Sequence, residues 1–116
     1  MASTPQLEPQ RVVPRQCPRY ALDFSLKVFS PGTTGATPGR SGDISLSGLS
    51  FYAPIELVAG QPIQLHFSLP HSQLTFGVWA IVQNVNGFRY GVEFTRLNAQ
   101  ENEELERVCR ILELKK

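Results

Sequence analysis

Short segments in which apolar and polar residues alternate restrict this chain to a β-rich fold. The alternation runs through residues 20–28, 63–69 and 88–94, and residues 76–85 form a more continuous apolar run. A period of two places successive side chains on opposite faces, as a strand with one buried face requires. Residues 44–53 are interpreted as two further short strands that bend at Gly48. The sequence therefore predicts five or six strands.

Turn and helix signals separate these strands and end the fold. The Asn-Gly pair at residues 86–87 predicts a hairpin with a type I′ turn, because both central residues of that turn need positive φ angles. Residues 30–40, SPGTTGATPGR, have the composition of a loop. Residues 98–114 predict an amphipathic helix, with Asn98 as its cap and Glu101 completing a capping box. This pattern indicates a small antiparallel barrel whose open end or edge the helix covers.

The aromatic side chains are expected to face mostly inward. In the last strand, the alternation places Arg89 and Glu93 outward. Its inward residues are predicted to be Phe88, Tyr90, Val92 and Phe94. Trp79 is interpreted as part of the core or of the barrel cover rather than as a stacking platform for a ligand.

The first residues differ in composition from the rest. Residues 1–18 hold four prolines and little apolar pattern, which is typical of a flexible arm. We therefore divide the chain into this arm and a folded domain at residues 19–116. With 116 residues, the chain is long enough for one domain with its own core.

Charge excludes several classes of partner. Charged residues make up 18% of the chain and the net charge is +1, whereas coating duplex DNA or an anionic membrane takes a strongly basic face. An OB-like barrel for single-stranded nucleic acid would need a basic groove with exposed aromatic residues, and we do not expect one here. The longest apolar run is too short to cross a bilayer, and no secretory signal is visible. We expect a cytoplasmic protein without membrane insertion.

The residues most often used in catalysis and metal binding are sparse. Cys17 and Cys109 lie far apart in the sequence, and His66 and His71 are isolated, so neither a disulfide framework nor a metal site is expected. No motif brings a nucleophile and a base together. We therefore expect a binding module rather than an enzyme.

Two short motifs flank the first predicted strand. Residues 15–19 read RQCPR, an RxxxR motif, and residues 43–48 read DISLSG, a DxSxxG motif. Asp43 and Ser45 are two positions apart, so their side chains share a face if the segment is a strand. Gly48 permits a bend or a close approach of the backbone.

In the order of these motifs, the strand between them and the apolar pattern after Gly48, the chain resembles the PilZ domain family, the bacterial receptors for cyclic di-GMP. The resemblance extends from about Arg11 to the final helix. It implies an all-β fold, a six-stranded, Greek-key-like antiparallel barrel with a C-terminal helix. It also implies cyclic di-GMP as the ligand, no cofactor, and an unidentified downstream protein that receives the signal.

The same resemblance implies a set of ligand-binding residues. These are Arg15, Arg19, Asp43, Ser45 and Gly48. The residue types suit the ligand: an arginine fork can bind a phosphate or the O6 and N7 atoms of guanine. A carboxylate can accept hydrogen bonds from the N–H groups of guanine, and a serine hydroxyl can donate or accept beside it.

The arginine pair has two possible registers. Arg11 and Arg15 have the same spacing as Arg15 and Arg19. We prefer the later pair, because Arg19 leads directly into the first strand, and Arg11 would then supply an additional contact. The alternative of a degenerate PilZ domain, used only for protein contact and not binding nucleotide, is disfavoured because the full motif set is present.

Overall fold

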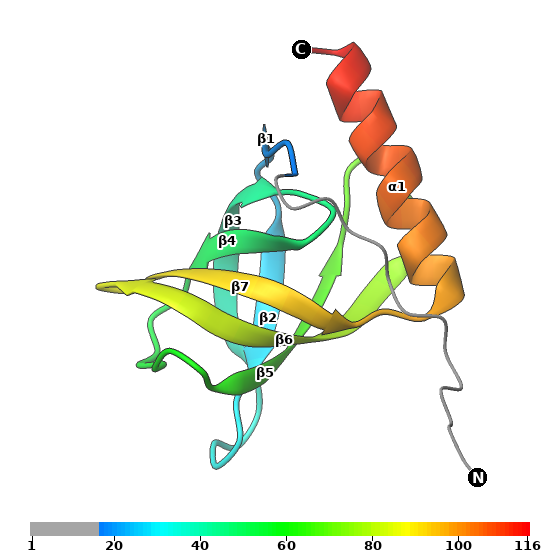
Figure 1. The fold of residues 1–116 in the computed structure, drawn as a ribbon. Coiled ribbons are helices and arrows are strands. Elements are labelled where there is room, and N and C mark those ends of the chain that lie inside the picture. Colours follow the sequence, from blue (N-terminus) through cyan, green and yellow to red (C-terminus); the bar gives the residue numbers. More distant parts are fainter. Residues whose placement is uncertain (1–16) are drawn as a thin grey trace, which may run out of the picture.

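The computed structural model describes residues 17–116, which form a barrel of antiparallel strands followed by one helix (Figure 1). The predicted arm at residues 1–18 therefore lies almost wholly outside the described residues. The strands, in chain order, are β1 (Tyr20–Ala21), β2 (Ser25–Phe29), β3 (Thr37–Ile44), β4 (Gly48–Tyr52), β5 (Pro62–Ser68), β6 (Thr75–Asn86) and β7 (Arg89–Arg96). The helix, α1, spans Ala99–Leu114.

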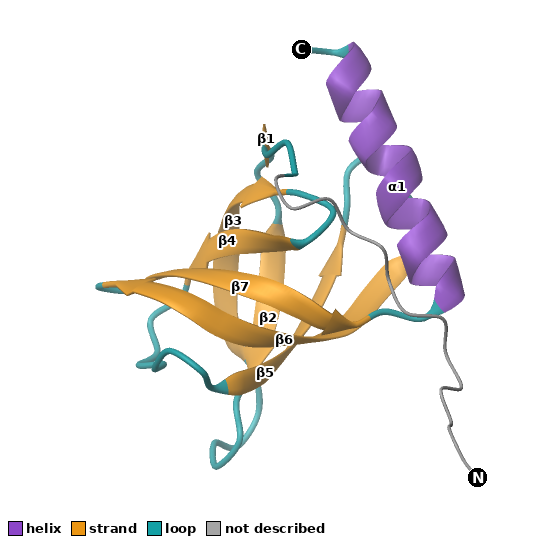
Figure 2. Cartoon of the chain, in the orientation of Figure 1, coloured by secondary structure: helices purple, strands orange, loops and turns teal. Residues whose placement is uncertain are grey.

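The pairing of β3 with β4 closes the sheet into a barrel (Figure 2). Around the barrel the strands follow the order β3-β2-β5-β6-β7-β4, and β1 adds a short pairing to the end of β3. Residues 53–61 connect β4 to β5, which are not neighbours, so the chain crosses the barrel there. This closed six-stranded antiparallel barrel with a C-terminal helix confirms the predicted fold class.

The barrel interior holds a single apolar cluster that the strand alternation predicts well. Every second residue of β5, and of β6 as far as Val82, is buried, as the period of two requires. The largest fully buried side chains are Tyr90, Phe51, Phe76, Ile44, Leu49, Ile63, Leu65 and Leu105. The Tyr90 hydroxyl reaches the crossing segment, where it donates to the Ile55 carbonyl at 2.6 Å. The core therefore anchors the connection between β4 and β5 as well as the strands.

The predicted strand at residues 20–28 is interrupted. Tyr20 and Ala21 pair with Ile44 and Asp43 as β1, whereas β2 begins only at Ser25. Between them the buried Ser41 hydroxyl donates to the Leu22 carbonyl at 2.5 Å and accepts from the Phe24 amide at 2.9 Å. The Ser41 side chain thus replaces backbone hydrogen bonds that a continuous strand would make at Leu22 and Phe24.

Strand β3 starts earlier than its composition indicates. Residues 30–40 were predicted as a loop, but Thr37–Arg40 pair with β2 and only the tip of the segment is a turn. The prediction of two short strands bent at Gly48 is also corrected: of the first piece only Ile44 lies in a strand, as the last residue of β3, residues 45–47 form a turn, and β4 begins at Gly48. Pairing with β2 outweighs the weak strand propensity of proline and glycine here.

The hairpin between β6 and β7 is real, but its turn lies one residue later than predicted. Asn86 pairs with Arg89, so Gly87 and Phe88 form the loop. Gly87 has a φ of +64° and Phe88 is not in the positive-φ region, a pattern that matches a type II′ rather than a type I′ turn. Phe88 is consequently 54% exposed instead of inward. Trp79 is 41% exposed as well, because Val78 and Ala80 on either side of it face the core.

Helix α1 begins as predicted. The Asn98 side chain accepts from the Glu101 amide at 2.7 Å, and the Glu101 carboxylate accepts from the Asn98 amide at 3.0 Å, which completes the capping box. The same buried carboxylate accepts from the Gly77 amide of β6 at 3.0 Å, so the cap also fastens the helix to the barrel. Within residues 17–116 no helix is long and apolar enough to cross a membrane.

The end of α1 is tied to β1. The Tyr20 hydroxyl donates to the Glu113 carboxylate at 2.7 Å. This hydrogen bond, more than any other contact, raises the pKa of Tyr20 to about 12, so the phenol stays protonated as a donor at neutral pH. The residue that follows Arg19 is therefore held against the last turns of the helix.

Candidate functional site

Arg19 and Asp43 meet on the outside of the barrel. Arg19 immediately precedes β1, whose Ala21 pairs with Asp43 on β3. The Arg19 Nη1 atom donates to the Asp43 Oδ1 atom at 2.8 Å. The arginine side chain is 50% exposed and the aspartate side chain 25%, so both charged groups remain open to solvent. The structure thus brings together one residue from each predicted motif.

A β-bulge directs Asp43 outward. The register of β3 against β4 shifts between Ser41 and Asp43, so that Gly42 is the extra residue of the bulge. Ser41 lies opposite the core residue Phe51, whereas Asp43 lies opposite Ser50. Without the bulge the alternation would carry Asp43 to the inner face, because a shift of one residue reverses every side chain.

Ser45 lies in the tight turn that joins β3 to β4. Its side chain is fully buried, and its Oγ atom accepts from the amides of Ser47 at 3.1 Å and Gly48 at 3.3 Å. The Ser45 amide donates to the Gly48 carbonyl at 2.8 Å and closes the turn. The hydrogen bonds of this hydroxyl are therefore made within its own turn, and its predicted contact with a ligand stays a prediction.

Gly48 is required by the approach of β4 to β7. A Cβ atom at this position would lie 1.9 Å from the carbonyl oxygen of Val92 and 2.9 Å from the carbonyl carbon of the same residue. Both are backbone atoms that cannot turn away. The close backbone approach predicted for Gly48 is thus present, and its partner is the neighbouring strand.

The DxSxxG motif is therefore a structural unit with one outward-facing charge. Its serine and glycine shape the turn and the β4–β7 contact, and its aspartate is displayed on the surface beside Arg19. Arg11 and Arg15 lie outside the described residues, so the choice between the two arginine registers stays open.

The sequence did not reveal a row of residues that extends from Asp43 across the neighbouring strands β4, β7 and β6. Asp43 lies opposite Ser50 on β4, Ser50 opposite Gly91 on β7, and Gly91 opposite Asn84 on β6. Directly opposite residues of antiparallel strands share a face of the sheet. Ser50 lies between Leu49 and Phe51, which face inward, so the alternation alone indicates that its side chain faces outward. Its position opposite Asp43 could not be predicted, because it depends on the bulge at Gly42.

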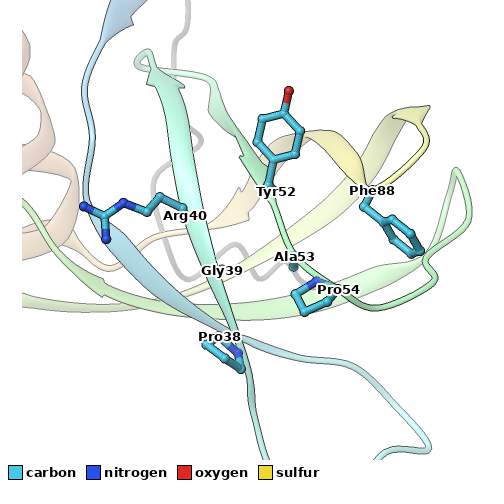
Figure 3. Close-up of a pocket in the computed structure, with 7 residues that line it drawn as sticks. All are labelled: Pro38, Gly39, Arg40, Tyr52, Ala53, Pro54 and Phe88. Atoms are coloured by element: carbon cyan, nitrogen blue, oxygen red, sulfur yellow. The ribbon is translucent and has the colours of Figure 1, made fainter.

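A second row lies one step further along the strands. Arg40 is opposite Tyr52, and Tyr52 is opposite Arg89, whose guanidinium lies over the tyrosine ring at 5.8 Å from its centroid. Arg40 is already paired, because its Nε and Nη2 atoms donate to the Asp23 carboxylate at 2.8 and 3.2 Å. Tyr52 and Phe88, each 54% exposed, border a shallow apolar hollow (Figure 3). Its other lining residues are Pro38, Gly39, Arg40, Ala53 and Pro54.

The arrangement offers hydrogen-bonding groups to a polar ligand. It presents an arginine cation and a carboxylate acceptor on the outer face of the barrel. The described part of the chain contains no group of three or more His, Cys, Asp or Glu side chains that could hold a metal ion. Cys109 is buried in the helix interface, and burial raises the pKa of its thiol to about 11, which keeps it protonated.

The comparisons with known proteins place this fold and motif set in a family. The family model of the PilZ domain matches residues 14–110. The chain therefore belongs to the PilZ domain family. The comparison with curated proteins gave no match.

Solved structures with the same fold include several PilZ proteins. The motility inhibitor MotI/DgrA of Bacillus subtilis aligns with a TM-score of 0.76 and 17% identity over 97% of this chain. This chain spans only 57% of that structure's length. The PilZ domain of YcgR from Escherichia coli, solved with c-di-GMP, has a TM-score of 0.67 and 18% identity over 87% of this chain and 92% of its own. The PilZ domain of CeSA from a cellulose-synthesizing bacterium has a TM-score of 0.62 and 18% identity over 82% of this chain and 97% of its own.

Proposed function

We propose that this PilZ domain binds cyclic di-GMP on the outer face of β3 and β4. The observation that carries the proposal is the Arg19–Asp43 pair, which joins the RxxxR and DxSxxG motifs at one exposed place. The ligand has two phosphates and two guanines, so its charges need arginines and its bases need hydrogen-bond acceptors. The family membership supports the same ligand. The proposed contacts are Arg15, Arg19, Asp43, Ser45 and Gly48, with Arg11 as an additional one.

Arg19 occupies the position that a guanine would take. In the ligand-free protein its N–H group donates to the Asp43 carboxylate, and the N1–H and N2–H groups of guanine are donors of the same kind. Binding then exchanges one donor for another, and the released guanidinium turns to a phosphate or stacks on the base plane. Because the Arg19–Asp43 pair is substantially exposed, breaking it costs little.

Ser45 and Gly48 contribute by holding the turn that presents Asp43. The backbone of Ser47 and Gly48 is fixed by the Ser45 hydroxyl, so the position of β4 relative to β3 is rigid before the ligand arrives. A rigid site pays less ordering entropy on binding. The proposed function is that of a receptor without enzymatic activity, which passes the signal to a partner protein.

The choice of base tests the role of Asp43. We expect cyclic di-GMP to bind the wild type and cyclic di-AMP to bind poorly, because adenine has no N1–H or N2 donor for the carboxylate. Asp43→Ala should weaken cyclic di-GMP binding about tenfold or more, since it removes charge-assisted hydrogen bonds. Isothermal titration calorimetry measures both.

The matched control is Asp23→Ala, which breaks an aspartate–arginine pair outside the motifs. It should leave the affinity unchanged. Equal affinity of the wild type for the two dinucleotides would contradict the role given to Asp43. Titration with single-stranded RNA at two salt concentrations separates this function from an OB-like one, in which RNA would bind with strong salt dependence.

Hydrogen exchange tests how the signal leaves the site. Arg19 precedes β1 directly, and four prolines leave residues 1–18 without an apolar pattern of their own. We expect amide exchange at residues 16–20 to slow when cyclic di-GMP saturates the protein, because ligand contacts at Arg15 and Arg19 would protect the backbone amides near them. Mass spectrometry after exchange in deuterated buffer reports it. Unchanged exchange there would show that the output lies in the barrel or in α1.

A further inference from the structure

Ser50 carries a buried hydroxyl without a partner. Its Oγ atom makes no hydrogen bond to any group in the described part of the chain, and the residue is 8% exposed. Buried polar atoms are nearly always paired, so an exception calls for an explanation. Ser41, one strand away, shows the usual situation: its equally buried hydroxyl makes hydrogen bonds to Leu22 and Phe24.

The unpaired hydroxyl lies beside the proposed ligand site. Ser50 is directly opposite Asp43 and so shares its outward face. The bulge residue next to Asp43 is Gly42, where a Cβ atom would lie 3.0 Å from the Ser50 Oγ atom. On the other side Ser50 faces Gly91. The hydroxyl is thus flanked by two residues without side chains and by one carboxylate.

We propose that Ser50 reads the O6 atom of the guanine whose N–H groups Asp43 holds. This inference rests on the proposed binding of cyclic di-GMP. The Watson–Crick edge of guanine carries two donors, N2–H and N1–H, followed by one acceptor, O6. A carboxylate and a hydroxyl on directly opposite residues, whose Cβ atoms are about 5 Å apart, complement that order of groups. The ligand then supplies the partner that the Ser50 hydroxyl lacks.

The Ser50 hydroxyl is buried in the ligand-free protein, and in this proposal the exchange that releases Asp43 from Arg19 also gives the base access to it. Arg19 leaves the Asp43 carboxylate for the ligand, and the guanine base takes its place beside β3. The O6 atom at one end of the Watson–Crick edge of the base then meets the Ser50 hydroxyl. The glycines at positions 42 and 91 place no side chain of their own beside the Ser50 hydroxyl, and a Cβ atom at position 42 would lie only 3.0 Å from it. Ser50 is therefore a specificity-determining residue outside the DxSxxG motif.

Ser50→Ala separates this role from a structural one. We expect the dissociation constant for cyclic di-GMP to rise about three- to tenfold, the effect of one neutral hydrogen bond. The melting temperature should stay the same or rise, because the substitution removes an unpaired buried hydroxyl. Ser41→Ala is the matched control: it should lower the melting temperature, since two buried backbone groups lose their partner, and leave the dissociation constant unchanged.

Cyclic di-IMP identifies the atom that Ser50 contacts. Hypoxanthine keeps O6 and N1–H but lacks the N2 amine, so Ser50→Ala should weaken this ligand by the same factor as cyclic di-GMP. A smaller factor for cyclic di-IMP would assign Ser50 to the amine and overturn the proposal. An affinity of the Ser50→Ala variant for cyclic di-GMP equal to that of the wild type would also overturn the proposal. Failure of the wild type itself to bind would instead refute the proposed function, and this inference with it.

Discussion

Replacing Arg19 with alanine is expected to weaken cyclic di-GMP binding roughly 10- to 100-fold while the barrel stays folded. A charge-assisted hydrogen bond contributes about 1.5–3 kcal/mol, and each 1.4 kcal/mol is tenfold in affinity. The Arg19–Asp43 pair of the free protein is half open to solvent, so its loss should change the free energy of unfolding by less than about 1 kcal/mol. Calorimetric titration gives the first quantity and chemical denaturation the second.

Arg40→Ala is the matched control for Arg19. Arg40 is also an exposed arginine paired with an aspartate, but it stands outside both motifs. Its replacement should leave the affinity within about twofold of the wild type, because an exposed ion pair contributes little. Arg15→Ala should match Arg19→Ala, and Arg11→Ala should cost less. If Arg11→Ala proves the most damaging of the three, the arginine pair is Arg11 and Arg15.

Gly48→Ala should destabilise the whole domain by about 3 kcal/mol or more. The added Cβ atom would lie 1.9 Å from the Val92 carbonyl oxygen, so the neighbouring strands β4 and β7 must separate there. Overpacking against a rigid backbone lies at the upper end of single-substitution effects. For a domain of this size the melting temperature would fall by roughly 12 °C or more.

Gly77→Ala provides the comparison for Gly48. Gly77 also lies within a strand, but a Cβ atom there would meet the His66 side chain at 3.5 Å, an ordinary contact. It should change stability by less than about 1 kcal/mol. A Gly48→Ala protein that keeps its melting temperature but loses the ligand would show that the glycine serves the ligand directly. Thermal denaturation of both variants should therefore precede any binding assay.

The core could be predicted from the sequence because alternation depends only on local pattern. Leu65 and Phe67 in β5, and Val92 and Phe94 in β7, are buried as expected. The predictions failed where pairing with a strand distant in the sequence determines whether a residue lies in a strand or faces the core. Thr37–Arg40 become strand because β2 lies beside them, and Phe88 becomes exposed because the turn shifts by one residue. Local propensity carries no information on either.

The site shows the same division. The two motifs assign Arg19 and Asp43 to one site, and the pairing of β1 with β3 brings the two residues together in the structure. The position of Ser50 does not follow, because it depends on a one-residue bulge at Gly42 that no motif marks. Whether the Ser45 hydroxyl faces a ligand or its own backbone is likewise decided by the length of the turn.

Closure of the barrel also limits how another protein can recognise this domain. Each of β2 to β7 has a hydrogen-bonded neighbour on both sides, and β1, the strand with a free edge in the described part, is two residues long. An incoming peptide therefore finds no backbone edge long enough to extend the sheet, a common mode of recognition in other β-rich adaptors. A partner must instead read side chains on the outer surface. Closure likewise protects the domain from edge-to-edge aggregation.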